Sequence, residues 1–200
     1  MLLSGCALLQ APNLDPAEGV LFYDDFSRFY SGWDIQKGEE GATRYQDGKY
    51  LIRVEEENLD LWGNPGLDLE DVSIEVDAVR TAGPAGNTFG IICRYRNAEN
   101  FYFGIVTSDN YYAIGERISG GVGLLGGEEL SFTNKVKGGS EVNHLRFDCV
   151  GSTLSLYANG TLLARVEGAV RESGDVGLIA GTLEEPGVEI NFDDFVVFEP

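Results

Sequence analysis

The sequence predicts an all-β protein, and three observations support this class. Segments with alternating apolar and polar residues follow one another along most of the chain, separated by short turn motifs. Glycine, at 27 of 200 residues, is frequent enough for many tight turns, and no long stretch shows helical periodicity. The triplet Asp-Asp-Phe occurs at residues 24–26 and again at residues 193–195, as expected if the first and last strands lie side by side. A chain of this length matches one sandwich domain.

The alternation places the predicted strands in order along the first half of the chain. They cover residues 20–26, 43–47, 49–55, 72–80 and 89–96. Asp47 and Gly48 are a strong hairpin signal, because both residue types accept the left-handed backbone of a two-residue turn. The clearest alternation is in 72–80, where Val72, Ile74 and Val76 share one face.

The second half of the chain continues the same pattern. Its predicted strands cover residues 101–107, 111–118, 143–150, 153–158, 161–167, 175–180 and 188–198. Residues 119–139 are rich in glycine and show no clear pattern. In the last strand the apolar residues change face at Asp193 and Asp194, which predicts a β-bulge there.

The chain is strongly acidic, with 33 Asp and Glu residues against 14 Lys and Arg residues and a formal charge of −19. Such a surface repels the phosphates of nucleic acids and the head groups of anionic lipids. We therefore expect no nucleic-acid partner. The charge favours solubility and divalent cations, although a merely solvated acidic surface is the plainer interpretation.

The first residues resemble the lipobox of a bacterial lipoprotein. In the sequence Leu-Ser-Gly-Cys at residues 3–6, Cys6 would become the lipidated first residue of the mature chain. A complete signal has an apolar stretch of about 7–15 residues, longer than the segment before Cys6, so a chance apolar stub is the alternative. We expect residues 1–19 to be this motif and a tether, and residues 20–200 to be the folded domain. No later segment is apolar enough to span a membrane, so we expect an extracytoplasmic protein held by its lipid alone.

The three cysteines can be apportioned from the same interpretation. If Cys6 is lipidated, Cys93 and Cys149 remain, and both alternate in phase with apolar neighbours that point to the core. An exported domain can oxidise such a pair where the two strands meet. We expect a disulfide, and two buried thiols are the alternative.

Motifs spread over residues 20–198 resemble the concanavalin A-like lectin/glucanase jelly roll of the laminin G-like kind. They are Leu-Phe-Tyr-Asp-Asp-Phe at 21–26 with Gly-Trp at 32–33, Gly-Ile-Ile-Cys-Arg-Tyr at 90–95, Asn-His-Leu-Arg at 143–146, Leu-Tyr-Ala-Asn-Gly at 156–160, Gly-Asp-Val-Gly-Leu at 174–178 and Phe-Asp-Asp-Phe at 192–195. The family often has Trp before the Asn of the third motif, where this chain has Val142. The resemblance implies a two-sheet antiparallel jelly-roll sandwich with a concave face that often holds sugar. It also covers calcium-stabilised and adhesive members, so fold alone does not give function.

Four aspartates at the two ends of the domain are candidate calcium ligands. Asp24 and Asp25 end the first strand, and Asp193 and Asp194 lie at the predicted bulge, which redirects carboxylates and carbonyls. Calcium takes about six to eight oxygen ligands of these kinds. We expect a structural calcium ion, if one binds, to lie between these ends. Two acidic strand ends in water are the alternative.

Six side chains are candidate sugar-binding residues, because aromatic rings stack on sugar C–H faces and Arg forks donate to hydroxyls. They are Trp62, Arg94, Arg96, Tyr102, Tyr111 and Arg117. If Cys93 faces the core, Arg94 faces away from it. The same alternation places Tyr102 opposite a core-facing Phe101 and Phe103. Cross-strand pairs on a solvated sheet face are the alternative.

The sequence supports catalytic residues less well than sugar-binding residues. Glu75 and Asp77 project from one strand face about 6.6 Å apart, comparable to the carboxyl pair of a glycosidase. Glucanases of the family that the chain resembles have a second Glu soon after this pattern, and this chain does not. His144, the only histidine, lies inside a predicted strand, and no Cys and His cluster suits zinc. We predict that the chain is not an enzyme.

Three function classes follow from these expectations. The first is a non-catalytic, lipid-anchored module that binds glycan or another surface polymer. The second is a structural or adhesive protein that packs against protein partners in an assembly. The third, least supported by the residues, is a glycoside-processing enzyme.

Overall fold

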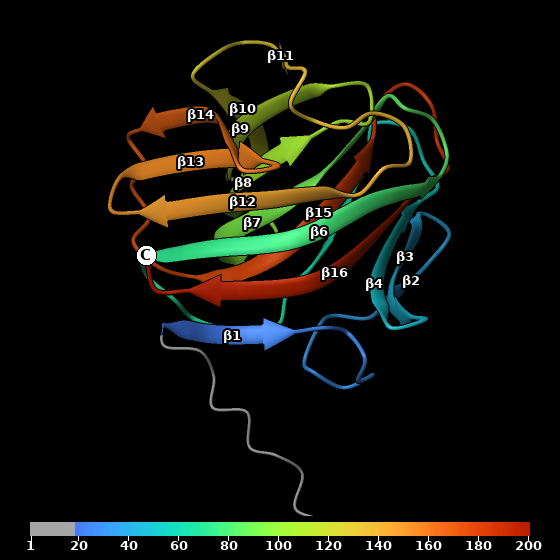
Figure 1. Cartoon of the computed structure of the whole chain (residues 1–200), viewed down its shortest axis with the longest axis horizontal. Coiled ribbons are helices and arrows are strands. Elements are labelled where there is room, and N and C mark those ends of the chain that lie inside the picture. The colour runs from blue at the N-terminus through green and yellow to red at the C-terminus, as the bar shows by residue number, and fades with distance from the viewer. Residues whose placement is uncertain (1–18) are drawn as a thin grey trace, which may run out of the picture.

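A computed structural model of the chain describes residues 19–200, which form two antiparallel sheets packed face to face (Figure 1). The nine-stranded sheet runs in the order β14 (Thr161–Glu167), β13 (Thr153–Ala158), β12 (Asn143–Val150), β6 (Val72–Ala82), β16 (Val188–Phe198), β4 (Lys49–Val54), β3 (Gly41–Gln46) and β2 (Gln36–Lys37), with β1 (Val20–Asp24) beside β16. The seven-stranded sheet runs β10 (Gly121–Leu125), β9 (Tyr111–Ile118), β8 (Asn100–Val106), β7 (Asn87–Asn97), β15 (Asp175–Thr182) and β5 (Asp60–Gly63), with β11 (Ser131–Phe132) beside β9. The predicted all-β, two-sheet architecture is confirmed. Among the described residues, no helix has the length and hydropathy to cross a membrane.

The first and last strands pair, as the repeated triplet predicts. Strand β1 lies beside β16 (Figure 1), and Asp24 is opposite Phe195 in their ladder. The N-terminal part of β16, up to Phe192, pairs with β4 instead, so β16 changes partner at Asp193 and Asp194. The register against β6 shifts at the same point, and Asp194 has φ +50°. The predicted bulge is therefore confirmed, and its physical role is to pass β16 from one neighbour to the next.

The two Phe residues of the triplets anchor a buried aromatic cluster. Phe26 is fully buried, and its ring lies 5.3 Å from that of Trp33 and 5.6 Å from that of Tyr50. Trp33 in turn meets Phe195 edge-to-face at 4.9 Å. Such pairs stabilise beyond the area that they bury. The Phe and Gly-Trp motifs of the first 33 residues are thus explained by packing.

The core lies between the two sheets, and the disulfide crosses it. Cys93 of β7 and Cys149 of β12 are both fully buried and bonded, with 6.7 Å between their Cα atoms. The predicted pairing is confirmed. Because β7 and β12 belong to different sheets, the bond ties the two layers together.

Turn chemistry at the tip of β3 and β4 matches the prediction. Asp47 and Gly48 have φ +52° and +71°, so both central residues are left-handed. This geometry follows the twist of the flanking strands, and Asp-Gly is a preferred pair for it.

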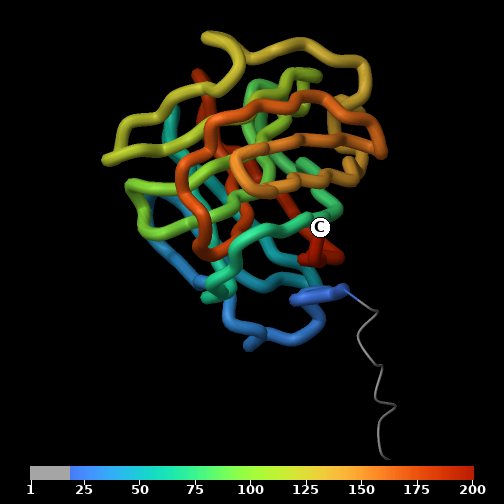
Figure 2. Tube along the Cα trace, turned by 90° about the vertical axis from the view of Figure 1, so that its left-hand side faces the viewer, coloured from blue at the N-terminus to red at the C-terminus, as the bar shows by residue number. Residues whose placement is uncertain are grey.

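Four short strands were not expected from the alternation, namely β2, β5, β10 and β11. The last two lie within residues 119–139, the segment without a clear pattern. Figure 2 shows the yellow segment around residues 125–140 at the end of the molecule opposite β1, which is blue. The edge strand β5 matters most, because it carries Trp62.

Candidate functional site

The outer face of the seven-stranded sheet carries an apolar cluster separate from the core. Its buried members are Ile92, Phe101, Phe103, Ile105, Ala113 and Ile179. They come from β7, β8, β9 and β15, strands whose other face fills the core with residues such as Ile91 and Leu178. An antiparallel sheet that packs one face on the core usually has a polar outer face. An apolar cluster on the outer face therefore marks a candidate binding surface.

A hollow on this face, which we call the outer groove, has a volume of about 350 Å³. It is lined by Asn58, Asp60, Thr88, Phe103, Ile105, Val122, Leu124, Leu130, Ile179, Thr182 and Leu183. Apolar side chains form most of this surface, and a few polar groups stand among them. That composition and size are typical of small-molecule sites.

Trp62 and Arg117 lie together on the same face. Trp62 is opposite Ile179 in the β5–β15 ladder, which turns its ring to the outer side. The Arg117 guanidinium carbon lies 5.4 Å from the centre of the Trp62 ring, and Phe101 is 5.3 Å away on centroids. The amide of Gln36 donates to the Trp62 carbonyl at 3.0 Å, which ties β2 to this edge. The structure thus brings together two of the six candidate residues.

Asp60 is the acidic residue of the outer groove, and the sequence analysis did not find it. Gly181 lies opposite Asp60 in the ladder, and a Cβ there would collide with the carboxyl oxygen, so glycine leaves room for the carboxyl group where it lies. Burial raises the pKa of Asp60 above its ordinary value of 3.8. A hydrogen bond from Thr88 Oγ1 at 3.4 Å and the charge of Arg117 offset that effect in part.

We predict that Asp60→Asn stabilises the protein at neutral pH. Because its pKa is raised, Asp60 binds its proton more tightly in the folded than in the unfolded protein. Its contribution to the free energy of unfolding is therefore fully present below pH 3.8 and is lost as the pH rises through the folded-state pKa. Urea titrations of both proteins across this range measure the difference, which should grow with pH. Asp47→Asn, at an exposed turn, is the matched control. A difference that grows toward low pH would contradict the raised pKa.

Two of the candidate sugar-binding residues are structural, and their predicted orientation is wrong. Tyr102 is fully buried in the core, while Phe101 and Phe103 face the outer side. The Tyr102 hydroxyl accepts from the backbone N–H of Val170 at 2.9 Å, so its polar end is satisfied at the rim of the core. Alternation could not give the phase, because both faces of β8 are buried.

Arg94 is 1% exposed, and it does not face a ligand surface. Its φ of +51° marks a register shift in β7, which rotates the side chain toward Asp71 at 3.1 Å and the carbonyl of Arg171 at 2.5 Å. Arg96, two residues further along β7, is exposed and lies 3.5 Å from Asp68.

Tyr111 lies at the opposite end of β9 from Arg117. It is 37% exposed, and its ring meets that of Phe132 at 5.6 Å. Tyr111 shares a face with Ala113 by alternation, so it stands on the outer side as predicted, away from Trp62.

The four aspartates predicted to bind calcium each have a separate partner. Asp24 Oδ1 accepts from the backbone of Phe26 at 2.8 Å, and hydrogen bonds from Ser27 lower the pKa of Asp25. Asp193 pairs with Lys49, and Asp194 accepts from Tyr23 at 3.2 Å. Within residues 19–200, no group of three or more His, Cys, Asp or Glu side chains is placed to hold a metal ion.

Calcium at this place stays a prediction. The motivating observation is Asp24 Oδ2, which is buried and has no hydrogen-bond partner. Calcium at tenfold its Kd would add about 1.4 kcal/mol to the free energy of unfolding, a rise in Tm of about 3–6 °C. Melting curves with calcium and with a chelator measure this, and Asp24→Asn should abolish the shift while Asp47→Asn keeps it. Superimposable curves for the unaltered protein would exclude the ion.

Glu75 and Asp77 lie on the outer face of the nine-stranded sheet, on the far side of the core from the outer groove. Their strand β6 buries Ile74 and Val76 in the core. The His144 ring bridges them, with Nδ1 at 2.8 Å from Asp77 and Nε2 at 3.4 Å from Glu75. The pair is therefore engaged by a cross-strand histidine. Cys6, the predicted lipidation site, lies outside the described residues.

No protein-family model matches the chain, and no curated protein matches its sequence. Solved structures share its architecture at low identity. A carbohydrate-binding module from Bacillus subtilis matches with a TM-score of 0.67 at 15% identity, over 84% of this chain and 96% of that one. A Bacillus subtilis protein of unknown function with a galectin-like fold matches with a TM-score of 0.66 at 10% identity, over 90% of this chain and 96% of that one. A Bacillus licheniformis β-glucanase matches with a TM-score of 0.65 at 9% identity, over 92% of this chain and 100% of that one. The chain therefore has the concanavalin A-like jelly-roll fold that its motifs predict.

Proposed function

We propose that the chain is a non-catalytic module that binds a glycan at the outer groove. The observation that carries this proposal is one sheet face that combines an apolar floor with Trp62, Arg117 and Asp60. Sugar rings present apolar C–H faces and a rim of hydroxyls, so an aromatic ring, a donor and an acceptor match both. The likeness of the fold to a carbohydrate-binding module and to a β-glucanase supports this class of ligand.

The small number of carboxyl groups at the outer groove supports binding without turnover. Most glycosidases need two carboxyl groups beside the scissile bond. Among the lining residues of the outer groove, Asp60 alone is acidic. The central strand β7 contributes Thr88 and Ile92 to this face, and neither side chain is an acid or base at neutral pH.

A screen of polysaccharides by affinity electrophoresis, with chromogenic glycosides in parallel, tests the proposal. Retention by at least one polysaccharide without turnover is the expected result. Turnover that disappears in Asp60→Asn or in Glu75→Gln would overturn the non-catalytic part. A chain retarded by no member of the panel would overturn the binding part.

A structural or adhesive role is the second candidate, and one surface favours it. Tyr30 is 95% exposed, and Phe29 and Ile35 nearby in sequence are more than half exposed. Exposed apolar side chains of this kind often pack against a protein partner. Sedimentation of the protein and of Tyr30→Ser distinguishes the two roles, because only assembly through this loop would depend on Tyr30.

We place the protein outside the cytoplasm, anchored through a lipid on Cys6. The buried disulfide supports an oxidising compartment, because such bonds persist mainly there. Expression of the full precursor with and without Cys6→Ser tests the anchor. The unaltered protein should fractionate with membranes and the variant with soluble protein, and equal fractionation would exclude the anchor.

A further inference from the structure

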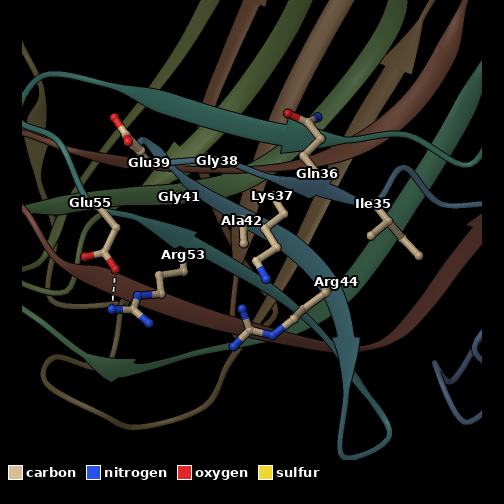
Figure 3. A pocket seen from close by; sticks show the side chains of 10 residues that line it. All are labelled: Ile35, Gln36, Lys37, Gly38, Glu39, Gly41, Ala42, Arg44, Arg53 and Glu55. Atoms are coloured by element: carbon tan, nitrogen blue, oxygen red, sulfur yellow. Dashed lines mark ion pairs between the residues drawn. The ribbon is translucent and has the colours of Figure 1, made fainter.

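A second pocket, with a volume of about 410 Å³, opens where β2, β3 and β4 lie side by side (Figure 3). It is lined by Ile35, Gln36, Lys37, Gly38, Glu39, Gly41, Ala42, Arg44, Arg53 and Glu55. Core residues such as Ile52 and Val54 alternate with Arg53 on β4, so the pocket lies on the outer face of the nine-stranded sheet. It is therefore distinct from the outer groove, which belongs to the other sheet.

Strand register brings three cations around one small residue. Ala42 pairs with Lys37 of β2 on one side and with Arg53 of β4 on the other. Arg44 is two residues beyond Ala42 on the same face of β3. Figure 3 shows the side chains of Lys37 and Arg44 approaching one another, while Arg53 turns toward Glu55 and Glu39 points away from all three. We call Lys37, Arg44 and Arg53 around Ala42 the basic pocket.

Two of these cations have no carboxylate partner. Arg53 is neutralised, because it pairs with Glu55 and lies 3.6 Å from Glu189. Neither Lys37 nor Arg44 forms a salt bridge with any residue in 19–200.

Arg44 is nevertheless held in place by a neutral acceptor. Its Nε and Nη2 donate to the Gln46 side-chain oxygen at 2.9 and 2.7 Å, which fixes the fork and leaves its charge intact. Acidic residues outnumber basic ones by 33 to 14 in this chain. Neighbouring cations without a counterion are therefore not what a merely solvated face of this protein would present.

The chemistry of the basic pocket fits one compact oxyanion. The outward Nη1 and Nη2 N–H groups of Arg44 that Gln46 does not accept, together with the Lys37 ammonium, match a carboxylate or a sulfate group. A net charge of −19 repels polyanions from a distance. A single anionic group meets less of that repulsion, because salt screens charges beyond about 8–10 Å. We propose that the basic pocket binds one carboxylate or sulfate group carried by an otherwise uncharged sugar. Only the choice of a sugar as the carrier rests on the proposed function, and binding of the anionic group does not.

Titration of the protein with glucuronate, glucose 6-sulfate and glucose, followed by NMR, tests this site. Both anionic sugars should bind more tightly than glucose, and inorganic sulfate should compete with them. The double variant Lys37→Gln/Arg44→Gln should lose at least about tenfold in affinity for the anions, because it removes two charge-assisted interactions. Preference for glucuronate over the sulfate, or the reverse, identifies the group that the site takes.

The control is Lys135→Gln/Arg165→Gln, which removes the same charge from strands and loops elsewhere. It should keep the affinity for the anions within about twofold, because distant surface charges are screened. Equal losses in the two double variants would show long-range attraction only and would overturn the site. Anion binding that the Lys37 and Arg44 changes leave intact, or no binding by either sugar or by sulfate, would also overturn it. Retention of a neutral polysaccharide reports on the outer groove and is independent of these results.

Discussion

The double variant Cys93→Ala/Cys149→Ala is expected to lose about 4 kcal/mol of unfolding free energy, the value that loop-closure entropy gives for a crosslink of this length. The two cysteines are 56 residues apart in the chain, so the bond removes much freedom from the unfolded state. Domains of this size are stable by only about 5–15 kcal/mol, so the loss is a large fraction of the total. Urea unfolding of both proteins without reductant measures it.

Reductant provides the control for this prediction. Dithiothreitol should not change the unfolding free energy of the double variant. It should lower the unfolding free energy of the unaltered protein toward that of the double variant. Thiol titration of the denatured, unreduced chain should find at most the thiol of Cys6. Two further thiols, or a loss of less than about 1 kcal/mol of unfolding free energy in the double variant, would mean that the bond does not contribute as proposed.

The positions of most strands along the chain and the bulge could be predicted because each leaves a local signature. Alternation shows one buried face in β6 and β12, and the change of face at Asp193 and Asp194 records the point where β16 changes its neighbour. The disulfide could be predicted for the same reason, because Cys93 and Cys149 each stand in phase with core residues.

The candidate site could be predicted only in part, because its strands are buried on both faces. In Phe101-Tyr102-Phe103 every residue can face either side, and what decides is the partner that the Tyr102 hydroxyl finds near Val170, far along the chain. In a strand that is buried on both faces, alternation between apolar and polar residues is missing, so the sequence does not show which residues face the core. The backbone of Arg94, left-handed at a register shift, is likewise set by its neighbours in space.

Edge strands explain what was missed altogether. The four residues of β5 have no alternation of their own, and they form a strand because β15 offers hydrogen bonds to Asp60 and its neighbours from more than a hundred positions away. The basic pocket has the same origin, since only the register of β2, β3 and β4 brings Lys37 and Arg53 to either side of Ala42.

Trp62→Ala is expected to weaken glycan binding roughly thirtyfold, about 2 kcal/mol, as loss of a central aromatic contact does. The Trp62 ring is half-buried, it forms the edge of the apolar face, and Arg117 lies over it at 5.4 Å. Removing it takes away the flat surface for a sugar ring and frees the guanidinium that would donate to the hydroxyls. Isothermal titration with the polysaccharide that the screen retains measures the loss.

The matched control is Tyr157→Ala. Tyr157 carries the same arrangement, with Arg146 at 5.1 Å from its ring, but on the nine-stranded sheet. Loss of an aromatic ring under an Arg side chain is thus compared on the outer faces of the two sheets. Affinity should fall for Trp62→Ala, recover largely in Trp62→Phe and stay unchanged for Tyr157→Ala, with all three variants melting as folded proteins. If Trp62→Ala binds as tightly as the unaltered protein, or if Tyr157→Ala loses as much, the glycan does not rest on Trp62 beside the outer groove, because removal of that ring would then have no specific effect on binding.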